Sequence, residues 1–135
     1  MTDFNQRIVK EFRAKDGRVG GMFAKLPLLL LHHKGAKTGT DRISPLAYRE
    51  LDQGWAVFAS KAGADSNPAW FHNLMANPRT RIEVGAETVD VQARIAGGAE
   101  YDEIWEAQKS DFPAFADYER KTSRDHIPVV VLERA

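Results

Sequence analysis

The feature that most restricts the fold of this chain is a succession of short strand patterns separated by turns, without the regular alternation of strand and helix that builds parallel sheets. Six segments are expected to form strands, over residues 28–34, 41–51, 55–60, 79–84, 88–95 and 127–132. Hairpin-type turns such as Asp52-Gln53-Gly54 and Gly85-Ala86 connect neighbours. Strands connected in this way pair antiparallel, and such a sheet can curl into a barrel. The sequence therefore predicts an α+β fold, an antiparallel β-barrel with flanking helices.

The N-terminal segment has the pattern of an amphipathic helix over about residues 3–15. Phe4, Ile8 and Phe12 recur every four residues and form one apolar stripe, which we expect to pack on the rest of the domain. A second interpretation is that the stripe contacts a membrane or a partner surface, because basic residues flank it: Arg7, Lys10, Arg13, Lys15 and Arg18. Residues 1–20 thus form an N-terminal unit, and the sequence leaves open whether this unit is mobile.

Three further helices are expected between and after the strands. Asn67 and Pro68 predict a helix start, with Asn67 as the N-cap and Pro68 in the first helical position. That helix ends near Asn77-Pro78, and helical patterns follow over residues 99–109 and 113–122. The chain has 135 residues and shows no repeat, linker or low-complexity stretch. We therefore expect one domain over residues 1–135.

Composition excludes several kinds of chemistry. The chain has no cysteine, which removes disulfides, thiol nucleophiles and cysteine-ligated metal sites. Its 19 Lys and Arg balance 19 Asp and Glu, so the total charge indicates no nucleic-acid partner. The balance is uneven along the chain, however. Residues 1–49 hold 10 basic and 4 acidic side chains, a net charge of +6, and the remainder carries −6.

Targeting signals and a metal site are not apparent. The N-terminus has no basic leader followed by an apolar run. The longest apolar stretch, residues 28–31, is far shorter than the ~20 residues of a membrane span, so a cytoplasmic protein is the expectation. His32 and His33 are adjacent in a strand and should point to opposite faces. His72 and His126 are isolated in the sequence, and we expect no metal site.

Residues 35–42, Gly-Ala-Lys-Thr-Gly-Thr-Asp-Arg, form the first segment with a chemical signal. This loop joins two strands, is rich in small residues, and contains the cations Lys37 and Arg42. Such a loop can turn successive backbone N–H groups toward an anion while the cations neutralise charge. An ordinary cationic hairpin turn is the alternative explanation.

A second loop, residues 60–67, leads from the third strand to the start of the following helix. Free N–H groups and the helix dipole favour an anion or a polar ring edge at such a position. Trp70 and Phe71 follow in the first turn and can flank a flat apolar ligand, although core packing explains these aromatic residues equally well. Two loops of this kind, each at a strand end and each carrying a cation, indicate a ligand with a charged group and a flat ring.

The motifs in these loops resemble the deazaflavin-dependent nitroreductase family. The matching strings are Lys37-Thr38-Gly39, Arg42, Pro45-Leu46, Ala59-Ser60-Lys61 with Gly63, Asn67-Pro68 with Trp70, Asn73-Leu74 and Asn77-Pro78. Later matches are Asp111-Phe112-Pro113, Phe115, Tyr118 and Ile127-Pro128-Val129-Val130. The similarity spans roughly residues 28–133.

This resemblance implies a split β-barrel like that of FMN-binding oxidases, with the deazaflavin coenzyme F420 as cofactor. The cofactor phosphate would be held by Ala36, Lys37 and Thr38, assisted by Arg42 and Lys61. The deazaflavin ring would be lined by Pro45, Leu46, Ala59, Ser60, Trp70, Phe71 and Asn73.

The resemblance also implies a substrate pocket formed by the late helical segment. Family nitroreductases have tyrosines there, whereas this chain has Phe112, Phe115 and Tyr118. We expect hydride transfer to an electron-poor acceptor: a quinone, an activated enone or a nitroaromatic. With one hydroxyl left in the pocket, a more apolar acceptor is expected in preference to a nitroimidazole. Ser60 or Tyr118 would donate to the reduced acceptor, and a solvent proton is the alternative.

Two other functions remain open from the residues alone. FMN presents a phosphate and a tricyclic ring as F420 does, so an FMN-dependent oxidoreductase of the pyridoxamine-phosphate-oxidase type is the nearest alternative. A non-catalytic cofactor-binding module, in contact with a membrane through its N-terminal helix, is the other. Since flavin-type split barrels are often dimers with shared sites, a homodimer is a further expectation.

Overall fold

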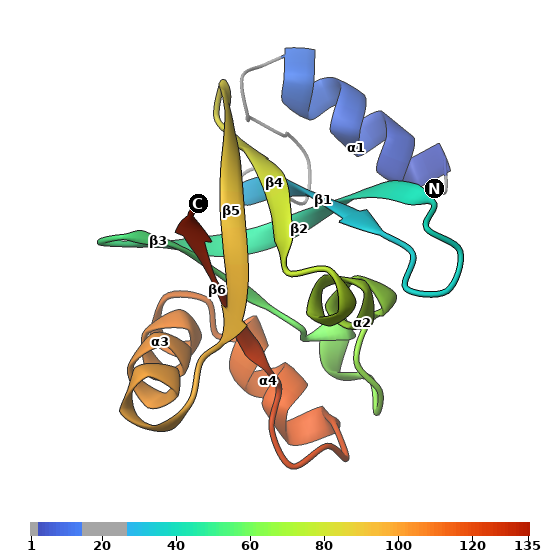
Figure 1. Ribbon diagram of the computed structural model, residues 1–135. Helices are drawn as coiled ribbons and strands as arrows, with labels where there is room; N and C mark the ends of the chain where they lie inside the picture. The colour runs from blue at the N-terminus through green and yellow to red at the C-terminus, as the bar shows by residue number, and fades with distance from the viewer. Residues whose placement is uncertain (1–2, 15–26) are drawn as a thin grey trace.

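The computed structural model describes residues 3–14 and 27–135, and within these ranges six strands close into a barrel (Figure 1). The strands are β1 (Leu28–Lys34), β2 (Asp41–Leu51), β3 (Gly54–Phe58), β4 (Arg79–Val84), β5 (Glu87–Ile95) and β6 (Val129–Arg134). Their order around the barrel is β1-β2-β3-β6-β5-β4, and β4 pairs back onto β1. Every neighbouring pair is antiparallel. The antiparallel split barrel predicted from the hairpin pattern is therefore confirmed.

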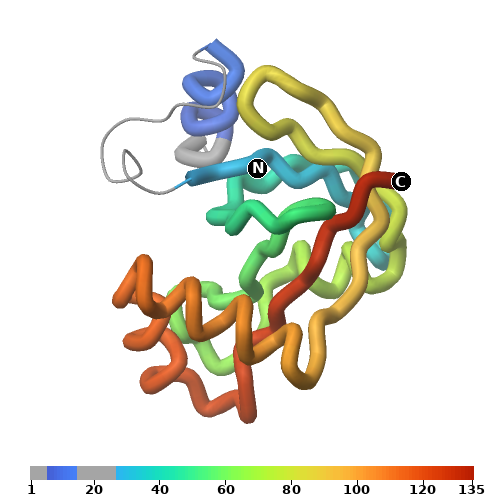
Figure 2. Tube along the Cα trace, turned by 90° about the vertical axis from the view of Figure 1, so that its left-hand side faces the viewer, coloured from blue at the N-terminus to red at the C-terminus, as the bar shows by residue number. Residues whose placement is uncertain are grey.

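Four helices flank the barrel in the described ranges: α1 (Asp3–Ala14), α2 (Ala69–Ala76), α3 (Gly98–Asp111) and α4 (Ala114–Lys121). A single 3₁₀ turn, η2 (Lys61–Gly63), precedes α2. Figures 1 and 2 place α1 at the opposite end of the molecule from α3 and α4. The loop predicted to bind a ligand follows β3 and contains η2. Because η2 contacts α4, this loop lies on the side of the barrel that α4 covers.

The leucine run of β1 is buried on both of its faces, which explains why it is continuous instead of alternating. Leu29 and Leu31 belong to the barrel interior. Leu28 and Leu30 face outward and are covered by α1. In β5, by contrast, Val89, Val91 and Ala93 are buried and alternate with exposed residues. Ile95 continues the same apolar alternation in the sequence but is 51% exposed at the strand end.

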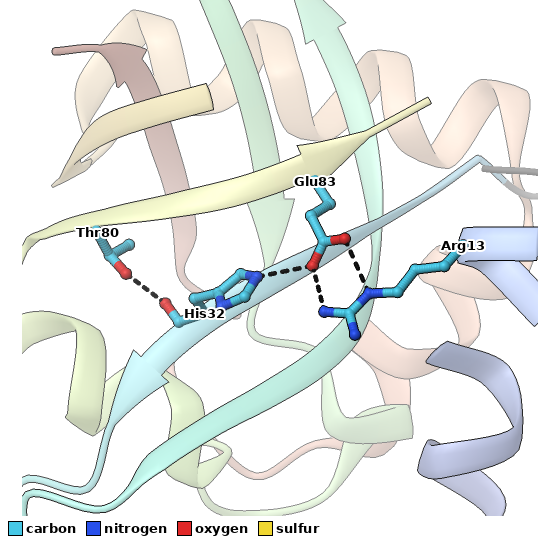
Figure 3. A network of polar contacts seen from close by, with 4 residues as sticks. All are labelled: Arg13, His32, Thr80 and Glu83. Atoms are coloured by element: carbon cyan, nitrogen blue, oxygen red, sulfur yellow. Dashed lines mark hydrogen bonds and ion pairs between the residues drawn. The ribbon is translucent and has the colours of Figure 1, made fainter. Parts of the chain in front are cut away.

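Helix α1 is held on the barrel by apolar packing and by one ion-pair network. Ile8 and Phe12 are buried against β1. Arg13 donates two hydrogen bonds to Glu83 of β4, at 3.0 and 2.8 Å, and His32 contacts the same carboxylate at 2.7 Å (Figure 3). The apolar stripe is thus used within the domain, and the membrane-contact interpretation of this helix is not supported. The side chain of Phe4, third member of the predicted stripe, lies outside the described residues.

Element boundaries differ from the predicted ones by one or two residues at several places. Strand β3, for example, covers Gly54–Phe58 instead of 55–60, so Ser60 lies beyond it. Helix α2 begins at Ala69, with Pro68 as its N-cap residue, instead of one position earlier with Asn67 as the cap. The last strand covers residues 129–134 instead of 127–132, because its ladder with β3 starts at Val129 and continues past the apolar run to Glu133. The glycines that follow the first helix in the sequence and were expected to end it, Gly17, Gly20 and Gly21, lie outside the described residues.

No helix among residues 3–14 and 27–135 combines the length and the apolar character that crossing a bilayer requires.

Candidate functional site

The loop between β1 and β2, residues 35–40, is a compact turn closed by its own backbone. The N–H of Gly35 donates to the carbonyl of Thr40 at 2.8 Å, and the N–H of Gly39 donates to the carbonyl of Gly35 at 2.8 Å. Gly39 has a φ of +70°, a conformation that glycine adopts without steric cost. We call this segment the β1–β2 loop.

The β1–β2 loop leaves two backbone donors free. Across residues 3–14 and 27–135, no group accepts from the N–H of Lys37 or Thr38. The side chains of Lys37 and Arg42 are exposed and make no ion pair with any described residue. Free N–H groups beside unpaired cations are what an anion such as a phosphate requires.

Asn73 of α2 anchors this loop. Its Oδ1 accepts the N–H of Ala36 at 2.9 Å, and its Nδ2 contacts Nδ1 of His33 at 3.0 Å. Because a backbone N–H can only donate, Asn73 must present its oxygen to Ala36 and its amide nitrogen to His33. The ring nitrogen Nδ1 is therefore the acceptor, and the His33 proton is on Nε2, which donates to the hydroxyl of Ser44 at 2.9 Å.

This hydrogen-bond pattern requires an uncharged His33. Burial lowers the pKa of His33 from 6.5 to about 4, and the positive charges of Arg42 and His32 act in the same direction. The imidazole is neutral at physiological pH and keeps Nδ1 free to accept from Asn73. His33 was not among the predicted site residues. Its only sequence signal was its position at the end of a strand, next to the cationic loop.

The second predicted loop, residues 59–67, has an unusual backbone. Ser60 is in the right-handed helical region, with φ −72° and ψ −43°, whereas Lys61 and Ala62 have positive φ angles of 47° and 53°. A right-handed residue followed by a left-handed one turns successive N–H groups to one side, forming an anion-binding concavity. Within the described part of the chain, the N–H groups of Ser60, Lys61 and Ala62 have no hydrogen-bond partner.

Helix α4 packs closely against this second loop. Gly63 has a φ of +81°, and a Cβ atom there would lie 3.0 Å from the carbonyl oxygen of Tyr118. Just after α4, the hydroxyl of Thr122 donates to the carbonyl of Ala64 at 2.7 Å, and the N–H of Ser123 donates to Asp65 at 2.9 Å. The structure thus brings the late helical segment against the Ser60 loop, although the two are more than 50 residues apart in the sequence.

The predicted substrate residues occupy one aromatic cluster at this place. Phe115 is 5% exposed and packs against Phe58, with ring centroids 5.4 Å apart, and against Tyr118 at 5.3 Å. Phe112 and Tyr118 are half-buried. The Tyr118 hydroxyl has no hydrogen-bond partner among residues 3–14 and 27–135. Phe115 therefore supports the cluster from within, and Phe112 and Tyr118 provide its accessible surface.

The residues predicted to line a ring are not equally accessible. Pro45, Leu46 and Ser60 are half-buried. Trp70 and Phe71 belong to the barrel core, so that only their edges reach the surface. Ala59 has no exposed surface: its N–H donates to Pro128 and its carbonyl accepts from Arg124. A contact between Ala59 and a ring stays a prediction, and in this structure both the side chain and the backbone groups of Ala59 are occupied within the protein.

Arg124 is the second residue that the sequence did not indicate. It lies after α4 and donates hydrogen bonds into residues 59–67. No local pattern marks it, because its partners are 57 to 65 positions away.

A groove lies apart from the two loops. It has a volume of about 510 Å³ and runs beside the β2–β3 hairpin and α3, where Arg94 bridges Glu100 and Glu133 at 2.5 and 3.0 Å. It contains none of the predicted site residues. No cluster of three or more potential metal ligands occurs among the described residues.

Comparison with known proteins identifies the family. Residues 5–134 match the family model of the F420H(2)-dependent quinone reductases. The chain belongs to this family. It is therefore an F420-dependent oxidoreductase, as the resemblance in the loop motifs predicted, and the family description specifies a quinone as the acceptor.

Individual relatives support the assignment of this F420-dependent reductase. An F420H(2)-dependent quinone reductase of Mycobacterium tuberculosis (strain H37Rv) is 36% identical over 127 residues, covering 91% of this chain and 85% of that protein. A solved F420-H2 dependent reductase is 33% identical, with a TM-score of 0.69, and the match covers 78% of this chain and 93% of that one. A solved domain-swapped dimer is 32% identical, with a TM-score of 0.73 and coverage of 95% and 96%.

The residues present fit the cofactor that this family uses. Coenzyme F420 combines a phosphate with a tricyclic ring. Within the described residues, the unpartnered N–H groups beside Lys37 and Lys61 are donors of the kind that a phosphate requires. The half-buried Pro45 and Leu46 are apolar surface of the kind that a ring would pack on. Coenzyme F420 is the cofactor of this reductase, and FMN is only a secondary option.

Proposed function

We propose that the two N–H-rich loops that meet at α2 bind coenzyme F420 and that the late aromatic cluster admits a quinone. The observation that carries this proposal is a set of backbone donors without a partner among residues 3–14 and 27–135, those of Lys37, Thr38, Ser60, Lys61 and Ala62. Within the same ranges no carboxylate forms an ion pair with the neighbouring cations. Two loops from different strands are connected to one helix and both present donors. A ligand with a phosphate and a polar ring edge uses both loops at once.

Within this proposal the phosphate is held by the backbone of Lys37 and Thr38 and by the charges of Lys37, Arg42 and Lys61. Ala36 contributes only its position, because its N–H is already given to Asn73. Asn73 acts in the same indirect way: both ends of its amide are used within the protein.

The ring rests on Pro45 and Leu46, with the edges of Trp70 and Phe71 and the backbone of Ser60 around it. When bound, the reduced deazaflavin supplies a hydride. Reduction of a quinone to a hydroquinone would consume that hydride and one proton, and the reduced cofactor releases one proton when it gives up its hydride. The hydroxyls of Ser60 and Tyr118 are the candidate donors to the developing oxyanion, and solvent is the alternative source.

The acceptor site is formed by Phe112 and Tyr118 above the buried Phe115. Its apolar character and its single hydroxyl favour a quinone over a polar nitroimidazole. We also propose that two copies of the chain assemble, because a solved chain that is 32% identical forms a domain-swapped dimer. Sedimentation velocity tests the assembly, and a monomer at micromolar concentration would contradict it.

The binding experiment is a fluorescence titration of F420 with the purified protein, with FMN titrated in parallel. Saturable binding of F420 and weaker binding of FMN is the expected result. Tight FMN binding, or a protein that is purified yellow, would favour the FMN-dependent alternative. F420 binding without oxidation of F420H2 by any acceptor would favour a non-catalytic module.

A further inference from the structure

The side chain of Arg124 connects both ends of the Ser60 loop. Its Nη1 donates to the carbonyl of Ala59 at 2.8 Å and to Oδ1 of Asn67 at 2.7 Å. Its Nη2 donates to the carbonyl of Ser60 at 2.8 Å. The remaining nitrogen, Nε, donates to the hydroxyl of Thr122 at 2.9 Å, which orients the guanidinium. One planar group thus connects the end of β3, the start of α2 and the segment after α4.

The loop between these anchor points is strained. Lys61 and Ala62 have positive φ angles, a left-handed conformation in which the Cβ atom of a non-glycine residue is crowded by the backbone. Backbone of this kind persists only where the surroundings hold it. Arg124 binds the two carbonyls immediately before the left-handed pair, so it acts at the point where the chain changes hand.

The same bonds act on the donors of the loop. The carbonyl of Ala59 shares its peptide group with the N–H of Ser60, and the carbonyl of Ser60 shares its peptide group with the N–H of Lys61. A cation that donates to a carbonyl withdraws electron density from its peptide group, and hydrogen bonds in such a chain strengthen one another. Arg124 therefore makes two of the three free N–H groups of this loop better donors, without touching a ligand itself.

A lysine cannot replace this arrangement. The guanidinium has donors on three nitrogens in a rigid plane, whereas an ammonium has three donors on one atom. The four acceptors bound by Arg124 come from residues 59, 60, 67 and 122. An ammonium that reaches one of these acceptors leaves others without a partner. The charge is kept in Arg124→Lys, and the geometry is lost.

We propose that Arg124 is a positioning residue for cofactor binding, which sets the conformation and the donor strength of the Ser60–Lys61 backbone. This inference rests on the proposed function, because it assumes that these N–H groups face F420. It assigns to a residue outside both loop motifs a role in F420 affinity that does not depend on its charge alone.

The test compares Arg124→Lys and Arg124→Ala with Arg81→Lys, a matched control at an exposed position of β4. Three quantities are measured: the Kd for F420 by fluorescence, the thermal midpoint, and the ¹⁵N–¹H amide resonances of residues 60–62 in the free protein. Arg124→Lys is expected to weaken F420 binding at least tenfold and to shift these resonances, while the thermal midpoint stays close to that of the wild type. Methylguanidinium added to Arg124→Ala is expected to restore part of the affinity.

An F420 affinity of Arg124→Lys within twofold of the wild type, with unshifted resonances at residues 60–62, would overturn the proposal. So would an equal loss of affinity in Arg81→Lys. If the wild-type protein itself fails to bind F420, the proposed function fails, and the amide resonances still report whether Arg124 sets the loop conformation. If Arg124→Ala does not fold, Arg124→Lys carries the test alone.

Discussion

The side-chain oxygen of Asn73 accepts the backbone N–H of Ala36 at 2.9 Å, which fixes the β1–β2 loop to helix α2. The second loop is fixed to the same helix by sequence, because it runs directly into Pro68, the N-cap residue. Helix α2 is thus the common reference for both loops. A ligand that bridges the loops depends on Asn73 although it need not touch that residue.

Asn73→Leu tests this relationship. The variant frees the loop N–H of Ala36 and leaves Nδ1 of the buried His33 without its donor. An unsatisfied buried acceptor costs about 1–3 kcal/mol. We expect urea denaturation to show a loss of that size in the free energy of unfolding and F420 binding to weaken. Asn77→Leu, at an exposed position just after α2, is the control and should change both quantities little. Equal effects of the two substitutions would show that the Asn73 bond has no special role.

His33 predicts a specific pH dependence of stability. Its folded-state pKa of about 4 lies below the unfolded value of 6.5, so the unfolded chain takes up the proton first as the pH falls. Stability therefore decreases from about pH 6.5 down to about pH 4, by roughly 2–3 kcal/mol in total. Urea titrations at several pH values measure this decrease. His33→Gln should remove most of it and His72→Gln none, and an unchanged slope in His33→Gln would contradict the assignment.

Lys37→Ala is expected to weaken F420 binding by about 1–3 kcal/mol, the range for a hydrogen bond to a charged group. The Kd rises accordingly by a factor of about 5 to 150. The loss should shrink as salt is added, because Lys37 is exposed and its charge is screened. Lys10→Ala, which removes the same charge from α1, is the control. A similar loss of affinity in both variants would mean that Lys37 acts only through the net charge.

Much of the fold was predictable because its elements are marked locally. The hairpin-type turns between the strand patterns predicted the antiparallel barrel, and the helical spacing of apolar residues predicted the helices. The errors have tertiary causes. Asparagine is a residue type that is favoured at the N-cap. The side-chain oxygen of Asn67, however, accepts a hydrogen bond from Arg124 at 2.7 Å, and the helix starts one residue later than predicted. The last strand continues past its predicted end at residue 132, since Glu133 still pairs with Gly54 of β3. Strand pairing uses backbone N–H and C=O groups, so a polar side chain does not end it.

The candidate site was predictable where the chain itself is contiguous, in the two loops. Arg124 and His33 were missed because their roles arise from partners distant in sequence, such as Ala59 and Asn73. Ala59 was placed at the ring by resemblance, whereas packing against β6 and Arg124 leaves it no surface. The sequence thus singled out the segments that we propose to bind the cofactor, and only the folded chain shows which residues hold those segments in place.

Tyr118→Phe separates proton donation from binding. The hydroxyl has no partner within the described residues, so its removal leaves no buried group unsatisfied. We expect slower steady-state turnover with a quinone and an unchanged Kd for F420. Phe112→Leu is a useful comparison, because it alters the apolar surface without touching a hydroxyl and should raise KM instead. A turnover rate of Tyr118→Phe equal to that of the wild type would leave Ser60 or solvent as the donor.

The most direct test of the central claim is stopped-flow oxidation of protein-bound F420H2, followed at the absorbance of the oxidised deazaflavin. A 1,4-naphthoquinone and a nitroimidazole are compared at equal concentrations, each with a protein-free control. The account predicts rapid, protein-dependent oxidation by the naphthoquinone and much slower oxidation by the nitroimidazole. No protein-dependent oxidation by the quinone, or a faster reaction with the nitroimidazole, would contradict it.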